Sequence, residues 1–410
     1  MTSAQRLEDI MEPNEAKLIR KTVREVVEKE IMPVRRQIDE DKEHIIVNRI
    51  LKKLLVDLGF QKAAFPPEFG GLGLINAINL ITAVEELARG DAGIAVSVGC
   101  VEWALAPILF PPYRNEKLLK EFAPMFMTDK PTLACFAMTE PESGCDIENF
   151  ALKGRKIRTR ARLEGDYWVI NGVKQWPSNT DASLYCVVCT TDPALGEEGI
   201  ALIYVPRETE GVSVGEIYEK AGMAADKNGV IYFDNVKVPK WYRAAGPGDD
   251  AKLLRQQISL GAIGSAAISI GSALNVFEIV NDYTGKRIVA DKPIKEHSIC
   301  AGILADMCIG IETARTYLYH VTYMFDHPEI YGPRWSEELH AKARIAKVYA
   351  AEVATMVAEK AMQLMGSFGY SRDSGVEKHW RDIVETIIWE GGAQLGRLDI
   401  ARYFCNLKTL

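Results

Sequence analysis

The stretch KIRTRARLEGDYWVINGVKQWPSNTDASLYCVVCTT, residues 156–191, decides the fold, because most of it has the alternating apolar and polar pattern of β-strands. Further strand-like runs occur at 132–138, 199–206 and 230–238, and turns rich in Gly, Asp and Asn separate them. We therefore predict a middle β domain over residues 131–243, folded as a barrel or a sandwich.

The sequence on both sides of this segment has a helical period instead. In residues 1–130, helical patterns cover 15–38, 48–60 and 78–90, which predicts an N-terminal helical domain. In residues 244–410, longer helical patterns cover 253–280, 297–325 and 340–366, which predicts a C-terminal domain like a four-helix bundle. The predicted fold class is α+β, in the order helices, sheet, helices.

Composition and charge exclude several classes of function. The net charge is −7 and the pI is near 5.6, which argues against a nucleic-acid-binding protein, because such binding depends on clustered Lys and Arg. The N-terminal residues have no apolar leader and carry early acidic residues, so we expect a cytoplasmic protein. The long apolar pattern at 253–280 is interrupted by Arg255, Gln256 and Gln257, which predicts a core helix rather than a membrane span.

The eight cysteines lack the repeated paired spacing of zinc sites or disulfide frameworks. Cys186 and Cys189 form one CxxC, but they lie within the apolar run LYCVVCT. A buried strand is the favoured interpretation there, and we predict no metal site.

Six segments in collinear order carry a resemblance to a known family. They are AMTEPESGCD (137–146), INGVKQWPSN (170–179), DNVKVP (234–239), Arg287 with the EHS at 296–298, MQLMGSFGYSRDSGVEKHWRD (362–382) and IIWEGGAQLGRLDIAR (387–402). Together they resemble the FAD-dependent acyl-CoA dehydrogenase family over nearly the whole chain. The resemblance implies the three-domain fold of that family, which agrees with the helix, sheet and helix pattern.

The resemblance implies a reaction in which a carboxylate removes the α-proton of an acyl-CoA thioester while the β-hydride passes to flavin N5. Glu390 stands where the family has this base, in WEGG, where the glycines let the backbone approach the thioester. Some relatives carry the base on another helix, immediately before an Arg. Here that position is Leu254, immediately before Arg255, so the resemblance offers no alternative to Glu390 as the base.

By resemblance, FAD is the cofactor and its contacts fall into two groups. Thr139 and Ser178 would donate hydrogen bonds to the flavin ring, and Trp176 would pack on it. The adenosine and pyrophosphate of an FAD shared with a neighbouring subunit would contact Arg287, Gln363 and Gly366, and Gln394 would reach the cofactor near the base. The expected substrate contacts are Cys145, Arg255, Trp389 and Gly391. The resemblance also implies an electron-transferring flavoprotein as electron acceptor and a homotetramer.

Departures from the family pattern bear on the substrate. Trp389 and Gly392 replace the common Tyr and Thr around the base, and Glu102 and Trp103 are unusually bulky for the end of the acyl cavity. Ala95 occupies the place of the Arg that holds a distal carboxylate in glutaryl-CoA enzymes. We predict a bulky substrate, such as an alicyclic, aromatic or 2-substituted succinyl thioester, for instance benzylsuccinyl-CoA, or a branched one. The alternatives are a short-chain, branched-chain or glutaryl-type enzyme, a flavin monooxygenase on the same fold, and a non-catalytic flavin or thioester binding module.

Overall fold

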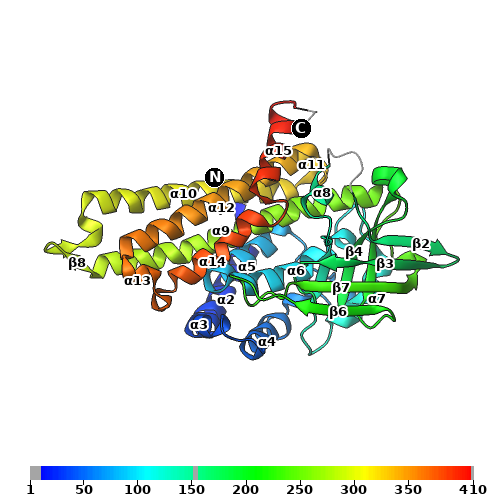
Figure 1. The fold of residues 1–410 in the computed structure, drawn as a ribbon, viewed down its shortest axis with the longest axis horizontal. Coiled ribbons are helices and arrows are strands. Elements are labelled where there is room, and N and C mark those ends of the chain that lie inside the picture. The colour runs from blue at the N-terminus through cyan, green and yellow to red at the C-terminus, as the bar shows by residue number, and fades with distance from the viewer. Residues whose placement is uncertain (1–10, 151–155, 408–410) are drawn as a thin grey trace, which may run out of the picture.

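The computed structural model describes residues 11–150 and 156–407, and Figure 1 shows their arrangement. The first segment of the chain is helical, as predicted. Its main helices are α2 (Asn14–Val26), α3 (Arg35–Ile38), α4 (Ile45–Lys52), α5 (Ala77–Gly90), α6 (Ala92–Leu109) and α7 (Glu116–Phe126). Figure 1 places α5 in the middle of the molecule, with α2, α3 and α4 on one side and the long C-terminal helices on the other, and α6 lies between α5 and the sheet.

The middle segment forms a curled seven-stranded sheet, which confirms the predicted β domain. Its strands are β1 (Ala134–Ala137), β2 (Arg160–Glu164), β3 (Tyr167–Gln175), β4 (Leu184–Thr190), β5 (Ile200–Pro206), β6 (Val212–Ile217) and β7 (Gly229–Pro239). The strand order is β1-β4-β2-β3-β7-β6, with β5 also paired to β4. All the predicted strands are present, but β6 was not predicted. It is a half-exposed edge strand, and its pairing with β7 is irregular around Gly215.

The C-terminal segment returns to helices, again as predicted. Its long helices are α9 (Asp249–Lys286), α10 (Ser298–Asp326), α12 (Glu337–Met365), α14 (Val376–Ile388) and α15 (Gly392–Phe404). The short elements are α8 (Cys145–Glu148), which precedes the sheet strands β2 to β7, then β8 (Ile288–Val289), β9 (Lys292–Pro293), α11 (Pro328–Tyr331) and α13 (Ser367–Tyr370). α9 packs against α5, α6, α10, α12 and α14, so it is the central helix of the fold.

Two helices, α6 and α9, are long and apolar enough to cross a membrane by length and composition. Their most apolar windows are 83% and 78% buried inside the protein, respectively. Core helices of large helical proteins have the same composition, and the sequence-based interpretation of 253–280 as a core helix agrees with this burial. The two cysteines of the CxxC are also buried, side by side with the apolar residues of β4.

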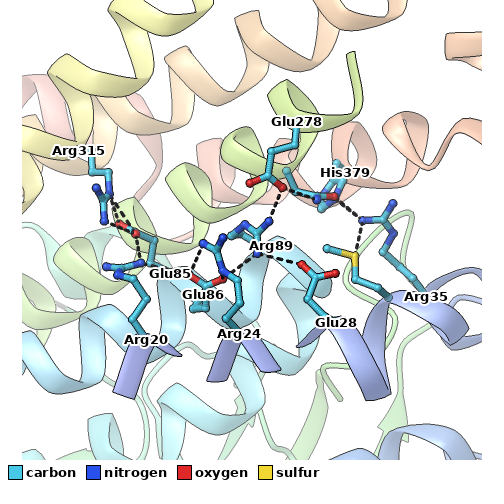
Figure 2. A network of polar contacts seen from close by, with 12 residues as sticks. Arg20, Arg24, Glu28, Arg35, Glu85, Glu86, Arg89, Glu278, Arg315 and His379 are labelled. Atoms are coloured by element: carbon cyan, nitrogen blue, oxygen red, sulfur yellow. Dashed lines mark hydrogen bonds and ion pairs between the residues drawn. The ribbon is translucent and has the colours of Figure 1, made fainter. Parts of the chain in front are cut away.

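A buried charge network joins the N-terminal helices to the C-terminal ones (Figure 2). Glu85 and Glu86 of α5 are fully buried. Arg20 of α2 lies 2.7 Å from Glu85, and Arg315 of α10 lies 3.0 Å from the same carboxylate. Arg89 lies 2.8 Å from Glu86 and also contacts Glu278 of α9. Each buried carboxylate is thus paired with arginines, as burial of a charge requires.

Candidate active site

A three-residue turn between two helices carries the predicted base. α14 ends at Ile388 and α15 begins at Gly392, and Glu390 lies between them with φ 52°. Gly391 and Gly392 follow with φ 72° and 70°, so three consecutive residues have left-handed backbone conformations. Such conformations are open to glycine but cost an L-residue roughly 1–2 kcal/mol. The glycine pair of WEGG thus forms the turn, and other contacts must hold Glu390 in its conformation.

The turn places Glu390 at a cavity between α5, α6 and α9, which has about 540 Å³ of space not filled by protein atoms, part of it open to solvent. The lining residues are Leu80, Val84, Val96, Gly99, Cys100, Trp103, Ser178, Leu260, Gly261, Gly264, Ser265, Ile268, Trp389 and Glu390. Among these, Glu390 is the only one with a charged side chain. An apolar cavity with one ionisable group is typical of a site that binds an apolar ligand and performs proton chemistry on it.

Glu390 is half-buried as a residue, and one oxygen of its carboxyl is shielded from solvent. Its Oε2 is buried and has no hydrogen-bond partner among the described residues. It lies against Gly261 of α9, where a Cβ atom would come within 2.7 Å of Oε2. Burial, and next the neighbouring Glu148, raise the pKa of Glu390 to about 8, although Arg344 and Lys347 act in the opposite direction. A carboxylate with a raised pKa is a stronger base than an exposed one.

This raised pKa predicts the pH dependence of any reaction in which Glu390 accepts a proton. Below about pH 8 the carboxyl is mostly protonated in the free enzyme, so kcat/KM should rise about tenfold per pH unit and level off above about pH 8. The free energy of unfolding changes in the opposite direction. Because the pKa of Glu390 is 4.5 in the unfolded chain and about 8 in the folded one, the contribution of Glu390 to stability falls as the pH rises from 4.5 to about 8. Steady-state kinetics across this range test the prediction, and a flat profile would contradict it.

Trp103 forms one wall of the cavity, and its neighbour Glu102 does not line it. The indole Nε1 of Trp103 donates a hydrogen bond to the carbonyl of Gln257 at 2.7 Å, and the Gln257 amide donates back to the Trp103 carbonyl. The Trp103 ring lies 4.9 Å from the ring of Phe136. Burial, with Asp326 as the next cause, raises the pKa of Glu102 well above its ordinary value. Trp103 is therefore the residue of this pair that limits the cavity.

The three predicted flavin contacts lie at the end of β3, and of the three Ser178 alone lines the cavity. Trp176 follows β3 with φ 69°, and its side chain is 49% exposed although it is a large aromatic residue. The carbonyl of Thr139 accepts a hydrogen bond from Gln175 at 2.9 Å, which places Thr139 beside Trp176. Ser178 lines the cavity, but its hydroxyl donates to Asp226 at 2.7 Å. Ser178 must therefore exchange this hydrogen bond before it can donate one to a flavin.

Three of the four other predicted cofactor contacts, Arg287, Gln363 and Gly366, lie at the opposite end of the C-terminal helices, near β8 and α13 in Figure 1. Arg287 caps the C-terminus of α9, about 39 Å along the helix axis from Gly261 at 1.5 Å per residue. Gln363 and Gly366, at the end of α12, are exposed there too. Gln394 is exposed on α15, close to the base in sequence. The structure thus separates the first group of contacts from Arg287, Gln363 and Gly366 within one chain.

The predicted substrate contacts are only partly brought together at the cavity. Trp389 lines it, and its indole Nε1 donates a hydrogen bond to the Ser265 hydroxyl at 2.5 Å. Gly391 is next to the base, and a Cβ atom at Gly391 would come within 2.9 Å of Glu148. Cys145 is exposed at the start of α8. Arg255 is not a lining residue: its guanidinium lies 4.5 Å from the Phe150 ring centre.

The position before Arg255 bears on the assignment of the base. Leu254 is fully buried and does not line the cavity. The residue of α9 that faces the Glu390 carboxyl is Gly261, two helical turns further along. No other Asp or Glu lines the cavity among the residues that the structure describes.

Comparison with known families decides what this chain is. The acyl-CoA dehydrogenase N-terminal domain matches residues 13–119, the middle domain matches residues 135–236, and the C-terminal domain matches residues 251–404. The chain belongs to the acyl-CoA dehydrogenase family. Acyl-CoA dehydrogenases are oxidoreductases acting on CH–CH bonds.

Relatives of this acyl-CoA dehydrogenase differ in the acyl group that their names state. The human short-chain specific acyl-CoA dehydrogenase of mitochondria is 31% identical, and the match covers 95% of this chain and 90% of the relative. The cyclohexane-1-carbonyl-CoA dehydrogenase of Syntrophus aciditrophicus is 28% identical over 93% of this chain and 94% of its own. The solved butyryl-CoA dehydrogenase of Megasphaera elsdenii has 27% identity and a TM-score of 0.83, covering 95% and 97% of the two chains.

Three residues near the base of this acyl-CoA dehydrogenase were not predicted from the sequence. Arg344 and Lys347 of α12 are fully buried, and both donate hydrogen bonds to the turn that carries Glu390. Glu148 of α8 is buried against them. A signal for the two cations exists in the sequence: they stand three residues apart, and therefore on one face, in the otherwise alanine-rich segment AKARIAKVYAAEVA. Charges on a buried face of a helix require partners.

Proposed function

We propose that this acyl-CoA dehydrogenase oxidises the Cα–Cβ bond of an acyl-CoA thioester and that Glu390 is the base that removes the α-proton. The observation that carries the proposal is the Glu390 carboxyl, whose Oε2 is buried and unpartnered, as the one acidic side chain that lines an apolar cavity. Its raised pKa suits proton abstraction near neutral pH. The left-handed turn keeps backbone groups of Glu390 and Gly391 beside the carboxyl, where they can approach a thioester closely.

The residues at the sheet side of the cavity suit FAD. The half-exposed indole of Trp176 offers a planar apolar surface. Thr139 accepts a backbone hydrogen bond from the neighbouring Gln175, and Ser178, two residues after Trp176, lines the cavity. When bound, FAD supplies the acceptor for the hydride that leaves Cβ. The exposed Arg287, Gln363 and Gly366 would hold the adenosine and pyrophosphate of an FAD whose ring is in a neighbouring subunit, since they lie too far from this chain's own cavity. A homotetramer, an electron-transferring flavoprotein as acceptor and a cytoplasmic location belong to the same proposal.

The shape and polarity of the cavity favour a compact, broad acyl group. Trp103 limits the cavity, whereas Gly264 leaves space along its side, since a Cβ atom there would have no heavy atom within 4 Å. Among the described residues that line it there is no Lys or Arg, so a second carboxylate in the acyl group would be buried without a partner. This favours alicyclic or branched acyl groups over glutaryl or benzylsuccinyl groups. The relatives do not separate these acyl groups, because the cyclohexane-1-carbonyl-CoA dehydrogenase and a glutaryl-CoA dehydrogenase are both 28% identical to this chain, so the choice rests on the cavity.

Anaerobic bleaching of the enzyme-bound flavin tests the proposal. The purified FAD-loaded protein is mixed with cyclohexanecarbonyl-CoA, branched short-chain, butyryl-CoA, long straight-chain, glutaryl-CoA and benzylsuccinyl-CoA thioesters. We expect the fastest bleaching with the alicyclic or branched thioesters and none with the dicarboxylic ones. Fast bleaching by glutaryl-CoA would contradict the assignment of substrate, and oxidised flavin with every thioester would contradict the assignment of reaction.

A further inference from the structure

Arg344 is a fully buried arginine that connects three parts of the chain behind the base. Its Nη1 donates a hydrogen bond to the backbone carbonyl of Glu390 at 2.6 Å. Its Nη2 donates to Glu148 of α8 at 3.0 Å, and its Nε donates to Asp399 of α15 at 3.0 Å. Since the guanidinium donors form a rigid planar fork, the two carboxylates fix the direction in which Nη1 points.

Lys347 acts on the neighbouring peptide group. It lies three residues after Arg344 on the same face of α12, and its ammonium donates to the backbone carbonyl of Trp389. The carbonyls of two consecutive residues are therefore held by two buried cations. These are the residues at which the chain leaves α14 and enters its left-handed turn.

We propose that Arg344 and Lys347 are positioning residues that hold the backbone of Trp389 and Glu390 so that the Glu390 carboxyl stays in the cavity. The inference rests on the proposed function only in the experiments that measure turnover. Without these two donors, the strained φ of Glu390 has fewer contacts to maintain it, and the turn can relax. A relaxed turn moves the carboxyl away from Gly261.

Arg344 and Lys347 also affect the ionisation of Glu390, together with the other charges that face it. Glu148 faces Glu390 from α8, and Arg344 and Lys347 face it from α12. Arg344, and Lys347 while it is protonated, favour the ionised form of Glu390, and Glu148 disfavours it. Burial lowers the pKa of Lys347 itself to about 8. Asp399 keeps other partners if Arg344 is removed, because Arg402 and His340 lie 2.9 Å and 3.2 Å from it. Glu148 would lose the cation that is hydrogen-bonded to it, so its charge is removed together with that of Arg344.

The test therefore uses the double variant Arg344→Met/Glu148→Gln and the single variant Lys347→Met, both with FAD bound. We expect each to lower the rate of flavin reduction by a thioester by about 10²-fold, the effect of misplacing a catalytic group by roughly 1 Å. If only the balance of charges around Glu390 mattered, the double variant, which removes one positive and one negative charge, would react at the wild-type rate. Retained rate and pH profile in both variants would overturn the proposal.

A readout independent of turnover separates this inference from the proposed function. The carboxyl band of Glu390 can be isolated by subtracting the infrared spectrum of Glu390→Gln from that of each protein at a series of pH values. We expect the titration midpoint of Glu390 in Lys347→Met to lie about one pH unit or more above that of the wild type. An unchanged midpoint would overturn the role of Lys347, even if no thioester reduced the flavin of the wild-type protein.

The matched control is Arg89→Met. Arg89 is also a buried arginine between two glutamates, Glu86 and Glu278, but it contacts helices rather than the turn of the base (Figure 2). We expect this variant to unfold at a lower temperature while the titration midpoint of Glu390 stays at its wild-type value. A shift of that midpoint in Arg89→Met as large as in Lys347→Met would overturn the proposal, because the effect would then follow from any lost buried cation.

Discussion

Glu390→Gln is expected to lower the rate of flavin reduction by a thioester by about 10⁴-fold, the upper end of what a positioned general base contributes. Glutamine keeps the size of the side chain but cannot accept the α-proton. FAD should remain bound, because the predicted flavin contacts Thr139, Trp176 and Ser178 are unchanged. Stopped-flow absorbance of the flavin under anaerobic conditions measures the rate, and the absorbance of the purified protein measures the FAD content.

The chain offers a matched control in Glu102→Gln. Glu102 is also a buried glutamate with an unpartnered oxygen, and burial raises the pKa of its carboxyl too, but it does not line the cavity. Its substitution should leave the rate of flavin reduction at the wild-type value. If Glu390→Gln turned over about as fast as Glu102→Gln, Glu390 would not be the base that removes the α-proton.

Gly261→Ala is expected to produce the second large effect, a loss of about 10²-fold in the rate of flavin reduction. The new Cβ would come within 2.7 Å of Glu390 Oε2 and within 2.9 Å of its carboxyl carbon, so the carboxyl must move. Gly261 lies inside α9, where alanine favours the helix by about 1 kcal/mol over glycine. The midpoint of thermal unfolding should therefore not report a large loss of stability, and the kinetic effect can be assigned to the displaced base.

Gly302→Ala serves as the control for the change in helix propensity. Gly302 lies in α10, and a Cβ atom there would have no heavy atom within 4 Å. This variant should gain the helix propensity of alanine without any loss of rate. If Gly261→Ala retained the wild-type rate, the close approach of α9 to the carboxyl would not matter for catalysis.

The sequence alone predicted the architecture well, because local periodicity is strong in this chain. The change from a helical period to a period of two and back located the sheet between the two helical segments. The edge strand β6 was missed, since its half-exposed residues and Gly215 give a weak apolar pattern. Glu390 could be singled out because its motif, with two following glycines, is contiguous in the sequence.

The remainder of the site depends on tertiary contacts that no local pattern contains. Helix α6 is apolar on nearly all sides, so periodicity could not show that Trp103 faces the cavity and that Glu102 does not. Gly261 contacts Glu390 from a helix that lies far away in the sequence. The contacts of Arg344 join α8, α12 and α15, and only the folded chain brings these three elements together.

The charge network of Glu85 and Glu86 has a consequence for how the chain folds. Both carboxylates lie on α5, but the arginines that neutralise them come from α2 and α10 as well as from α5 itself (Figure 2). If α5 packed against α9 before these helices arrived, it would bury unpaired charge, which is unfavourable. We therefore expect the N-terminal and C-terminal helices to fold together as one unit, although the sheet separates them in the sequence.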